Sequence, residues 1–258
     1  GSATVGLAVD SDVRVTYVGN AGFLIEIGEH KVLIDAMFDG FPGGYALPAG
    51  VRSALGGALP PFDGVDLILV THNHADHFSA GLVREHMTAN PAAILVAGPQ
   101  VTRQLSDLGS RAVTLTATAG APATTTQNSA RVEAICLSHG VFPAGQEEVV
   151  NYGYVVTIGD VTLFHTGDID AAVIGLDVFR GYGLAAMGID FAFVPHFLLG
   201  GRSADPSFVA AIGATYVIAA HYEYTTLPLM RTAILKAYPT AVVFENDHEL
   251  DSWTMPSP

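Results

Sequence analysis

Apolar residues fall along the chain in short runs separated by turn residues. The first three runs, residues 13–18, 23–27 and 32–34, are rich in β-branched and aromatic side chains, with Asn and Gly in the gaps. This spacing predicts an antiparallel meander, because strands joined by a few turn residues pair with their neighbours in sequence. Residues 36–64 are rich in Gly and Pro. We expect a long loop there, with at most one helical turn, that could shape a binding pocket.

The middle of the chain alternates between apolar runs and helical periodicity. Residues 67–70 are continuously apolar, which is typical of a strand covered on both faces. From residue 79 to residue 87, apolar side chains recur on one face of a helix. A further strand, helix and strand are predicted at residues 93–97, 100–108 and 112–115. The low-complexity stretch 117–127 then divides the chain near its middle.

The second half of the chain repeats this arrangement. Strands are predicted at residues 132–137, 152–158, 161–164, 191–194, 215–220 and 241–244, and helices at residues 206–212 and 228–238. The halves, about 12–116 and 130–258, thus each supply a sheet with helices that must cover it. The economical packing is an α/β four-layer αββα sandwich, with two facing mixed β-sheets and helices outside, in one domain over residues 1–258.

Composition narrows the possible functions. The 258 residues are 50% hydrophobic, yet no apolar run approaches the ~18 residues that a membrane-spanning helix needs, so we expect no membrane span. Cys136 is the only cysteine, and we expect it in the core. One cysteine excludes both an intrachain disulfide and a thiolate-rich metal site. Any metal ion must therefore be bound by nitrogen and oxygen atoms.

The charge balance and the first residues bear on partners and location. A formal net charge of -14 would repel a polyanion, so we expect no nucleic acid as partner. We expect a small-molecule substrate, which can be anionic because bound metal ions can reverse the sign of a pocket. The start Gly1-Ser2-Ala3 resembles the scar of a cleaved tag. Loss of a signal peptide there would indicate an exported protein, periplasmic or secreted; otherwise we expect a cytoplasmic one.

Residues with metal-binding chemistry gather directly after the predicted strand at residues 67–70. His72 and His74 are two residues apart in extended chain, so their imidazoles point to the same side and can bind one ion. Asp76 and His77 follow where the chain turns into the next helix, and they suit a second ion nearby.

Three further predicted strands are each followed by a residue of the same kind, namely His139, Asp168 and His221. If these strand ends meet at one edge of the sandwich, five histidines and two aspartates come together on loops held by rigid strands. Such a cluster of nitrogen and oxygen donors indicates a metal-dependent enzyme.

The order of these residues resembles the metallo-β-lactamase superfamily over essentially the whole chain. The motif His72-x-His74-x-Asp76-His77 is followed by His139, by Asp168 in a Thr-Gly-Asp segment, and by His221. Residues 19–25 and 32–35 also resemble the branch of the ascorbate-6-phosphate lactonase-like proteins. The resemblance implies that a first metal ion is bound by His72, His74 and His139, a second by Asp76, His77 and His221, and that Asp168 bridges them.

The implied cofactor is a pair of divalent metal ions. Imidazoles suit zinc, iron or manganese, and zinc is the first expectation. Two ions about 3.5–4 Å apart can share a water molecule, lower its pKa and deliver hydroxide to a carbonyl or phosphoryl group. Asp76 could orient that hydroxide through its second oxygen. The predicted function is therefore hydrolysis of a small ester, lactone or phosphodiester.

Several other residues near strand ends have two interpretations. His196 follows the strand at residues 191–194 and could contact substrate, act as an acid, or simply pack. Lactonase-like relatives tend to have small residues there, so His196 departs from that branch. Tyr222 and Tyr224 could donate to a substrate oxygen or could be packing residues. The remaining histidines, His30, His86, His165 and His248, are interpreted as packed or surface residues, with His165 packing behind the ligands.

Two other functions fit parts of the pattern. A mononuclear iron oxidoreductase of the same fold, of the sulfur dioxygenase type, would leave some residues of the second set unused. A noncatalytic binding protein that has kept the fold would be expected to have lost ligands. All seven positions are filled here, which favours the hydrolase.

Overall fold

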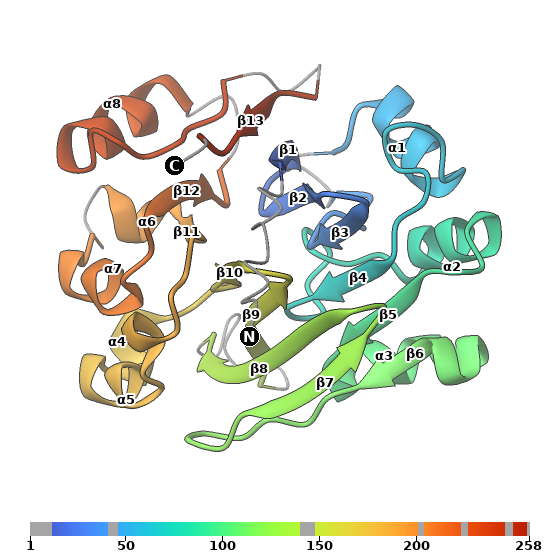
Figure 1. Cartoon of the computed structure of the whole chain (residues 1–258), viewed down its shortest axis with the longest axis horizontal. Coiled ribbons are helices and arrows are strands. Elements are labelled where there is room, and N and C mark those ends of the chain that lie inside the picture. Colours follow the sequence, from blue (N-terminus) through green and yellow to red (C-terminus); the bar gives the residue numbers. More distant parts are fainter. Residues whose placement is uncertain are drawn as a thin grey trace, which may run out of the picture.

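Two β-sheets face each other in the computed structural model, and helices cover the outer face of each (Figure 1). The structure describes residues 12–40, 46–139, 148–200, 204–222, 227–245 and 250–256. Tyr224, His248 and residues 140–147 lie outside the described residues. The predicted four-layer αββα sandwich is confirmed.

The first sheet is mixed and has the strand order β13-β1-β2-β3-β4-β5-β6. Its strands are β1 Val13–Gly19, β2 Gly22–Ile27, β3 His30–Ile34, β4 Leu67–Val70, β5 Ile94–Ala97, β6 Ala112–Thr114 and β13 Ser252–Thr254. The first three form the predicted antiparallel meander, and β3 to β6 run parallel. β13 pairs antiparallel with β1, so a late strand of the chain completes the sheet that the first half builds.

The second sheet is also mixed and has the order β12-β11-β10-β9-β8-β7. Its strands are β7 Ala123–Gln127, β8 Ala130–Ser138, β9 Val150–Ile158, β10 Val161–His165, β11 Phe191–Pro195 and β12 Tyr216–Ala220. β7 to β10 are antiparallel neighbours, and β10, β11 and β12 run parallel. β10, β11 and β12 therefore end at the same edge of this sheet.

Helices form the two outer layers (Figure 1). The first sheet is covered by α1 Ala49–Gly56, α2 Ala80–Ala89 and α3 Pro99–Thr102, which continues as a 3-10 helix over Arg103–Arg111. On the second sheet lie α4 Ala171–Ile174, α5 Leu176–Gly181, a 3-10 turn at Leu184–Ala186, α6 His196–Leu199, α7 Pro206–Ile212 and α8 Leu227–Ala237. Within the described ranges, no helix is long and apolar enough to cross a membrane.

Alternate residues of β4 pack into two different cores. Leu67 and Leu69 belong to the core between the two sheets, whereas Ile68 and Val70 belong to the core beneath α1 and α2. Because both faces of this strand are buried, its sequence is continuously apolar, as predicted. The first polar residue after β4 is Thr71, where the loop begins.

Three local predictions are wrong. Where one helical turn near residues 51–55 was the most expected, the eight-residue helix α1 forms, because Leu55 is buried and Arg52 pairs with Glu85 of α2. β7 forms in the low-complexity stretch, since alternate residues of this edge strand are partly buried. Residues 241–244 form no strand; a single bridge joins Val242 to Ile218.

Candidate metal centre

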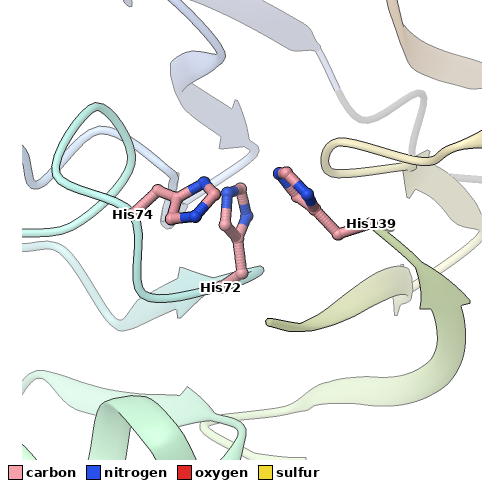
Figure 2. A group of neighbouring side chains, drawn as sticks. All are labelled: His72, His74 and His139. Atoms are coloured by element: carbon pink, nitrogen blue, oxygen red, sulfur yellow. The ribbon is translucent and has the colours of Figure 1, made fainter. Parts of the chain in front are cut away.

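Seven predicted ligands come together where four strands end. β4 leads into the loop of residues 71–77, and His139, Asp168 and His221 follow β8, β10 and β12. They form two groups, and within each group the ligand atoms lie within 4.8 Å of one another. The first group is His72, His74 and His139, and the second is Asp76, His77, Asp168 and His221. Figure 2 shows the three rings of the first group turned toward a common space.

A tight turn splits the loop of residues 71–77 between the two groups. The amide nitrogens of His77 and Phe78 both donate to the carbonyl oxygen of His74, at 3.0 and 2.9 Å. The chain therefore turns after His74, so Asp76 and His77 belong to the second group, although the ring of His77 also lies 4.1 Å from that of His72. This confirms the predicted change of direction within the motif.

Asp168 lies between the two groups. Its Oδ2 atom is 2.9 Å from Nε2 of His221 and 3.2 Å from Nε2 of His77, both in the second group. The same oxygen is 3.7 Å from Nε2 of His139 and 4.0 Å from Nε2 of His72, both in the first group. A single carboxylate thus contacts or approaches histidines of both groups.

Several buried polar atoms at this centre have no hydrogen-bond partner among the described residues. They are Nε2 of His72, Nε2 of His77, both ring nitrogens of His139 and Oδ1 of Asp168. Each such atom costs about 1–3 kcal/mol when buried without a partner, and these atoms converge on one place. Lone pairs left open in this way, all on nitrogen or oxygen, fit a site that binds metal ions.

Charges at the centre determine which groups hold protons. Burial and the neighbouring His77 lower the pKa of His72 well below its usual value, so His72 is neutral and its lone pair is available. Burial also opposes charge on His77 and His221, but nearby carboxylates outweigh it: Asp168 and Asp35 raise the pKa of His77 well above the usual value, and Asp168 raises that of His221 to about 9. A metal ion must therefore displace protons from the second group.

Asp35 is a residue of this site that the sequence reasoning missed. Its side chain is fully buried, and its Oδ1 atom accepts a hydrogen bond from the amide of Thr71 at 2.8 Å. Oδ2 accepts from the hydroxyl of Thr71 at 2.6 Å and lies 2.8 Å from Nδ1 of His77. A carboxylate that accepts from the distal ring nitrogen of a histidine leaves Nε2 free to bind metal.

The same carboxylate also orients a histidine of the first group. Because the hydroxyl proton of Thr71 is donated to Asp35, the Thr71 oxygen can only accept from Nδ1 of His72, at 3.0 Å. Asp35 therefore fixes the tautomer of one histidine in each group. The available signal in the sequence was an aspartate directly after a buried strand.

Asn151 holds together the loops that carry His139 and Asp168. From β9, its amide nitrogen donates to the carbonyl oxygens of Leu137 and Thr166, both at 3.2 Å. Its Oδ1 atom accepts from the amide of Asp168 at 3.1 Å. Gly167 makes this approach possible: its φ is +56°, and a Cβ there would stand 2.1 Å from Oδ1 of Asn151.

Three residues other than glycine have left-handed backbone beside the centre. They are Asn20, Asp35 and His221, with φ values of 49°, 48° and 56°. Asn20 donates its side-chain amide to Asp76, at 3.0 Å from the backbone oxygen and 3.2 Å from Oδ2. The amide of His221 in turn donates to the carbonyl oxygen of Asn20 at 2.9 Å. The β1–β2 turn thus joins two candidate ligands of the second group.

His196 lies next to the second group, at the start of α6. Its Nδ1 atom is hydrogen-bonded to the backbone oxygen of His221, and the two rings are 6.3 Å apart. Burial lowers the pKa of His196, so its ring is neutral and donates through Nδ1. His165 supports the segment before Asp168: its Nδ1 accepts from the amide of Gly167 at 3.0 Å, and its Nε2 donates to the carbonyl oxygen of Ala21 at 2.9 Å.

Tyr222 adopts the packing arrangement that the sequence allowed as an alternative. It is 2% exposed and stacks on Tyr17 with ring centroids 5.2 Å apart. Its hydroxyl accepts from the amide of Phe244 at 3.2 Å and donates to the carbonyl oxygen of that residue at 3.4 Å. Tyr224 stands in the part of the chain that the structure does not describe.

A cavity of about 560 Å³ opens beside the centre. His139 and Asp168 are among its lining residues, so it reaches both groups of candidate ligands. The rest of its lining comes from the segment after Asp168 and from the region of α6 and the start of α7. A cavity of this size can hold a small molecule.

Comparison with known proteins gives a family. A model of the β-lactamase superfamily domain matches residues 14–176. A UPF0173 metal-dependent hydrolase from Pyrococcus furiosus is 30% identical over 235 residues, covering 82% of this chain and 85% of that protein. One from Thermococcus kodakarensis is 31% identical over 220 residues, with the same coverage. The predicted likeness to the ascorbate-6-phosphate lactonase-like branch stays a prediction.

Solved structures share the fold at low sequence identity. A metallo hydrolase from Ignicoccus hospitalis has a TM-score of 0.63 at 17% identity and covers 95% of this chain and 100% of that one. An isothiocyanate hydrolase from Delia radicum gut bacteria has a TM-score of 0.60 at 16% identity and covers 94% and 100%. The matches in sequence and fold agree, and the chain belongs to the metallo-β-lactamase superfamily, among the UPF0173 metal-dependent hydrolases.

Proposed function

We propose that this metal-dependent hydrolase binds two divalent metal ions and cleaves a small ester, lactone or phosphodiester. The observation that carries the proposal is the position of Asp168, whose Oδ2 atom is 2.9 Å from His221 and 3.7 Å from His139, one residue of each group. A carboxylate in that place can bind two ions at once and offset part of the repulsion between them.

The two groups divide the proposed ligands between the ions. His72, His74 and His139 would bind the first ion, Asp76, His77 and His221 the second, and Asp168 both. Zinc is the metal expected first, with manganese or iron as alternatives, because imidazole and carboxylate ligands suit all three. When bound, such a pair polarises a carbonyl or phosphoryl group and lowers the pKa of a water molecule toward neutrality.

The protein itself would position these groups and move the protons. Asp35 keeps the Nε2 lone pairs of His72 and His77 directed at the centre. Asp76 has its Oδ2 atom held by Asn20 at 3.2 Å, and we assign its carboxylate the task of orienting the attacking water molecule. His196 has Nδ1 occupied by the backbone oxygen of His221, so in the neutral ring Nε2 is unprotonated and would accept a proton or a hydrogen bond from the substrate.

The test combines metal analysis with a substrate panel. Protein stripped with a chelator and reloaded with zinc, manganese or iron is expected to hold about two ions per chain and to hydrolyse at least one ester, lactone or phosphodiester. One iron at saturation with oxygen-dependent turnover would favour the oxidoreductase alternative. Tight binding of a substrate without turnover at any metal loading would favour the noncatalytic alternative.

A further inference from the structure

The lining of the cavity beside the candidate metal centre has an apolar part and an acidic part. Its apolar lining consists of Ile169, Ala171, Ala172, Phe197, Leu198 and Ala204. Half of these side chains are alanines, and the cavity of about 560 Å³ leaves room for a group of the substrate to lie against an apolar surface. His139 and Asp168, two candidate metal ligands, also line the cavity, so a group that occupies it lies next to the proposed metal ions.

The polar part of the lining is acidic. Besides Asp168, the cavity is bordered by Asp170 and Asp205, and no lysine or arginine is among its described lining residues. Both aspartates are fixed in place by helix starts. Oδ1 of Asp170 accepts from the amides of Ala172 and Val173 at 3.0 and 3.2 Å, and Oδ1 of Asp205 accepts from that of Ser207 at 2.9 Å.

A negatively charged group in this cavity would face two fixed carboxylates in addition to Asp168. Like charges at short range in a partly buried site repel one another, and the described lining supplies no lysine or arginine to offset that repulsion. Proteins that recognise phosphate usually supply arginine or lysine for the purpose. An uncharged or cationic group meets no such obstacle, and a cation would be attracted.

We propose, on the basis of the proposed function, that the substrate is a carboxylic ester or lactone. The group beside its reacting carbonyl is small, and it is either apolar and uncharged or cationic. That group lies in the cavity between Asp168 and Asp205. Phosphodiesters are disfavoured, because the charge of the phosphoryl group would lie next to the acidic lining even when metal ions offset part of it.

Three lactones of similar size test the proposal on the metal-loaded protein. The probes are γ-butyrolactone, its α-amino derivative and a ring-carboxylated derivative, with hydrolysis followed by proton release; bis(para-nitrophenyl) phosphate is the fourth probe. The neutral and amino lactones are expected to have kcat/KM values at least about 10-fold above that of the carboxylated lactone, a difference of about 1.4 kcal/mol.

Variants connect this preference to the cavity. Asp205→Asn keeps a side chain that can cap α7 but removes its charge, so the ratio between neutral and carboxylated lactones should fall several-fold. Asp177→Asn is the matched control, because its carboxylate is fully exposed on α5 and does not line the cavity; the ratio should not change.

Each outcome decides between the two proposals. Preference for the carboxylated lactone or for the phosphodiester would overturn the substrate class while leaving the metal-dependent hydrolase intact. An unchanged ratio in Asp205→Asn would overturn the assignment of the cavity. Failure to hydrolyse any of the four probes at any metal loading would contradict the proposed function itself.

Discussion

The two sheets supply the centre in different ways. The first sheet contributes four candidate ligands from the single loop after β4, and one buried carboxylate, Asp35, supports that loop. The second sheet contributes His139, Asp168 and His221 singly, from the ends of three strands. Neutral groups, chiefly the amide of Asn151 and the ring of His196, hold them. The first part of the centre, the loop from His72 to His77, is local in sequence. The second part, formed by His139, Asp168 and His221, depends on tertiary structure.

Removal of the residue that joins the two parts should have the largest effect. Asp168→Ala is expected to lower kcat/KM by about 1,000-fold or more, because the carboxylate that approaches both groups is lost. The second ion should be weakened most. Metal content and kcat/KM are measured together, with the exposed Asp177→Ala as control. Two retained ions with near-normal turnover would refute the bridging role.

The next effect tests the support of the first part. Asp35→Ala leaves Nδ1 of His77 and the amide of Thr71 without their partner, so metal affinity should fall by about 10–100-fold. Both ions should be affected, since Asp35 orients one histidine of each group. Titration with zinc against a competing chelator measures the affinity. Asp63→Ala, an exposed carboxylate of the same half, should match the unmodified protein.

A smaller effect is expected in the second part. Asn151→Leu leaves the amide of Asp168 and the carbonyl oxygens of Leu137 and Thr166 without this partner, so the free energy of unfolding should fall by about 2–4 kcal/mol. Urea unfolding of the metal-free protein measures it. Asn90→Leu, which breaks a single bond to Val65 far from the ligands, should cost less and leave metal affinity unchanged. Equal metal affinities in the two variants would contradict a positioning role for Asn151.

The smallest effect concerns the helix layer behind the first part. His86 is buried on α2, with Nδ1 2.6 Å from the carbonyl oxygen of Leu55, and burial lowers its pKa. The unfolded chain therefore binds the proton more readily, so stability contributed by neutral His86 is complete above its unfolded pKa and is lost as the pH falls toward the folded pKa. His86→Gln should reduce the slope of unfolding free energy against pH in that window, by at most about 1.4 kcal/mol per pH unit. An unchanged slope between the two proteins would show that His86 does not titrate in this way.

The contrast between the two parts also explains what the sequence could predict. The motif from His72 to His77 is dense enough to identify without a fold, and the strand before it is buried on both faces, so its apolar run is unambiguous. His139, Asp168 and His221 required a sheet topology that brings separate strand ends together. Asp35 and Asn151 were not assigned a role, because their hydrogen bonds join segments 36 and 17 residues apart.

The two wrong strand predictions, at β7 and at residues 241–244, have a related cause. β7 is an edge strand whose threonines resemble a low-complexity linker, and it forms because β8 offers it a partner. The bridge at Val242 fails to extend into a strand, although the sequence there is apolar, as only one pair of residues comes into register with β12. Local propensity fixes neither outcome, since both depend on the neighbouring strand.

The left-handed backbone at Asn20, Asp35 and His221 is unfavourable in free energy, and packing elsewhere in the fold must offset it. Side chains other than glycine lose about 1–2 kcal/mol in that conformation, with Asn and Asp losing least. His221 is one of the three, and it is also a candidate ligand. An ion that binds only this arrangement returns stability to the chain in proportion to its affinity. Metal supply would then act on the lifetime of the protein as well as on its turnover, and a cell short of metal would degrade the enzyme sooner than one that has enough.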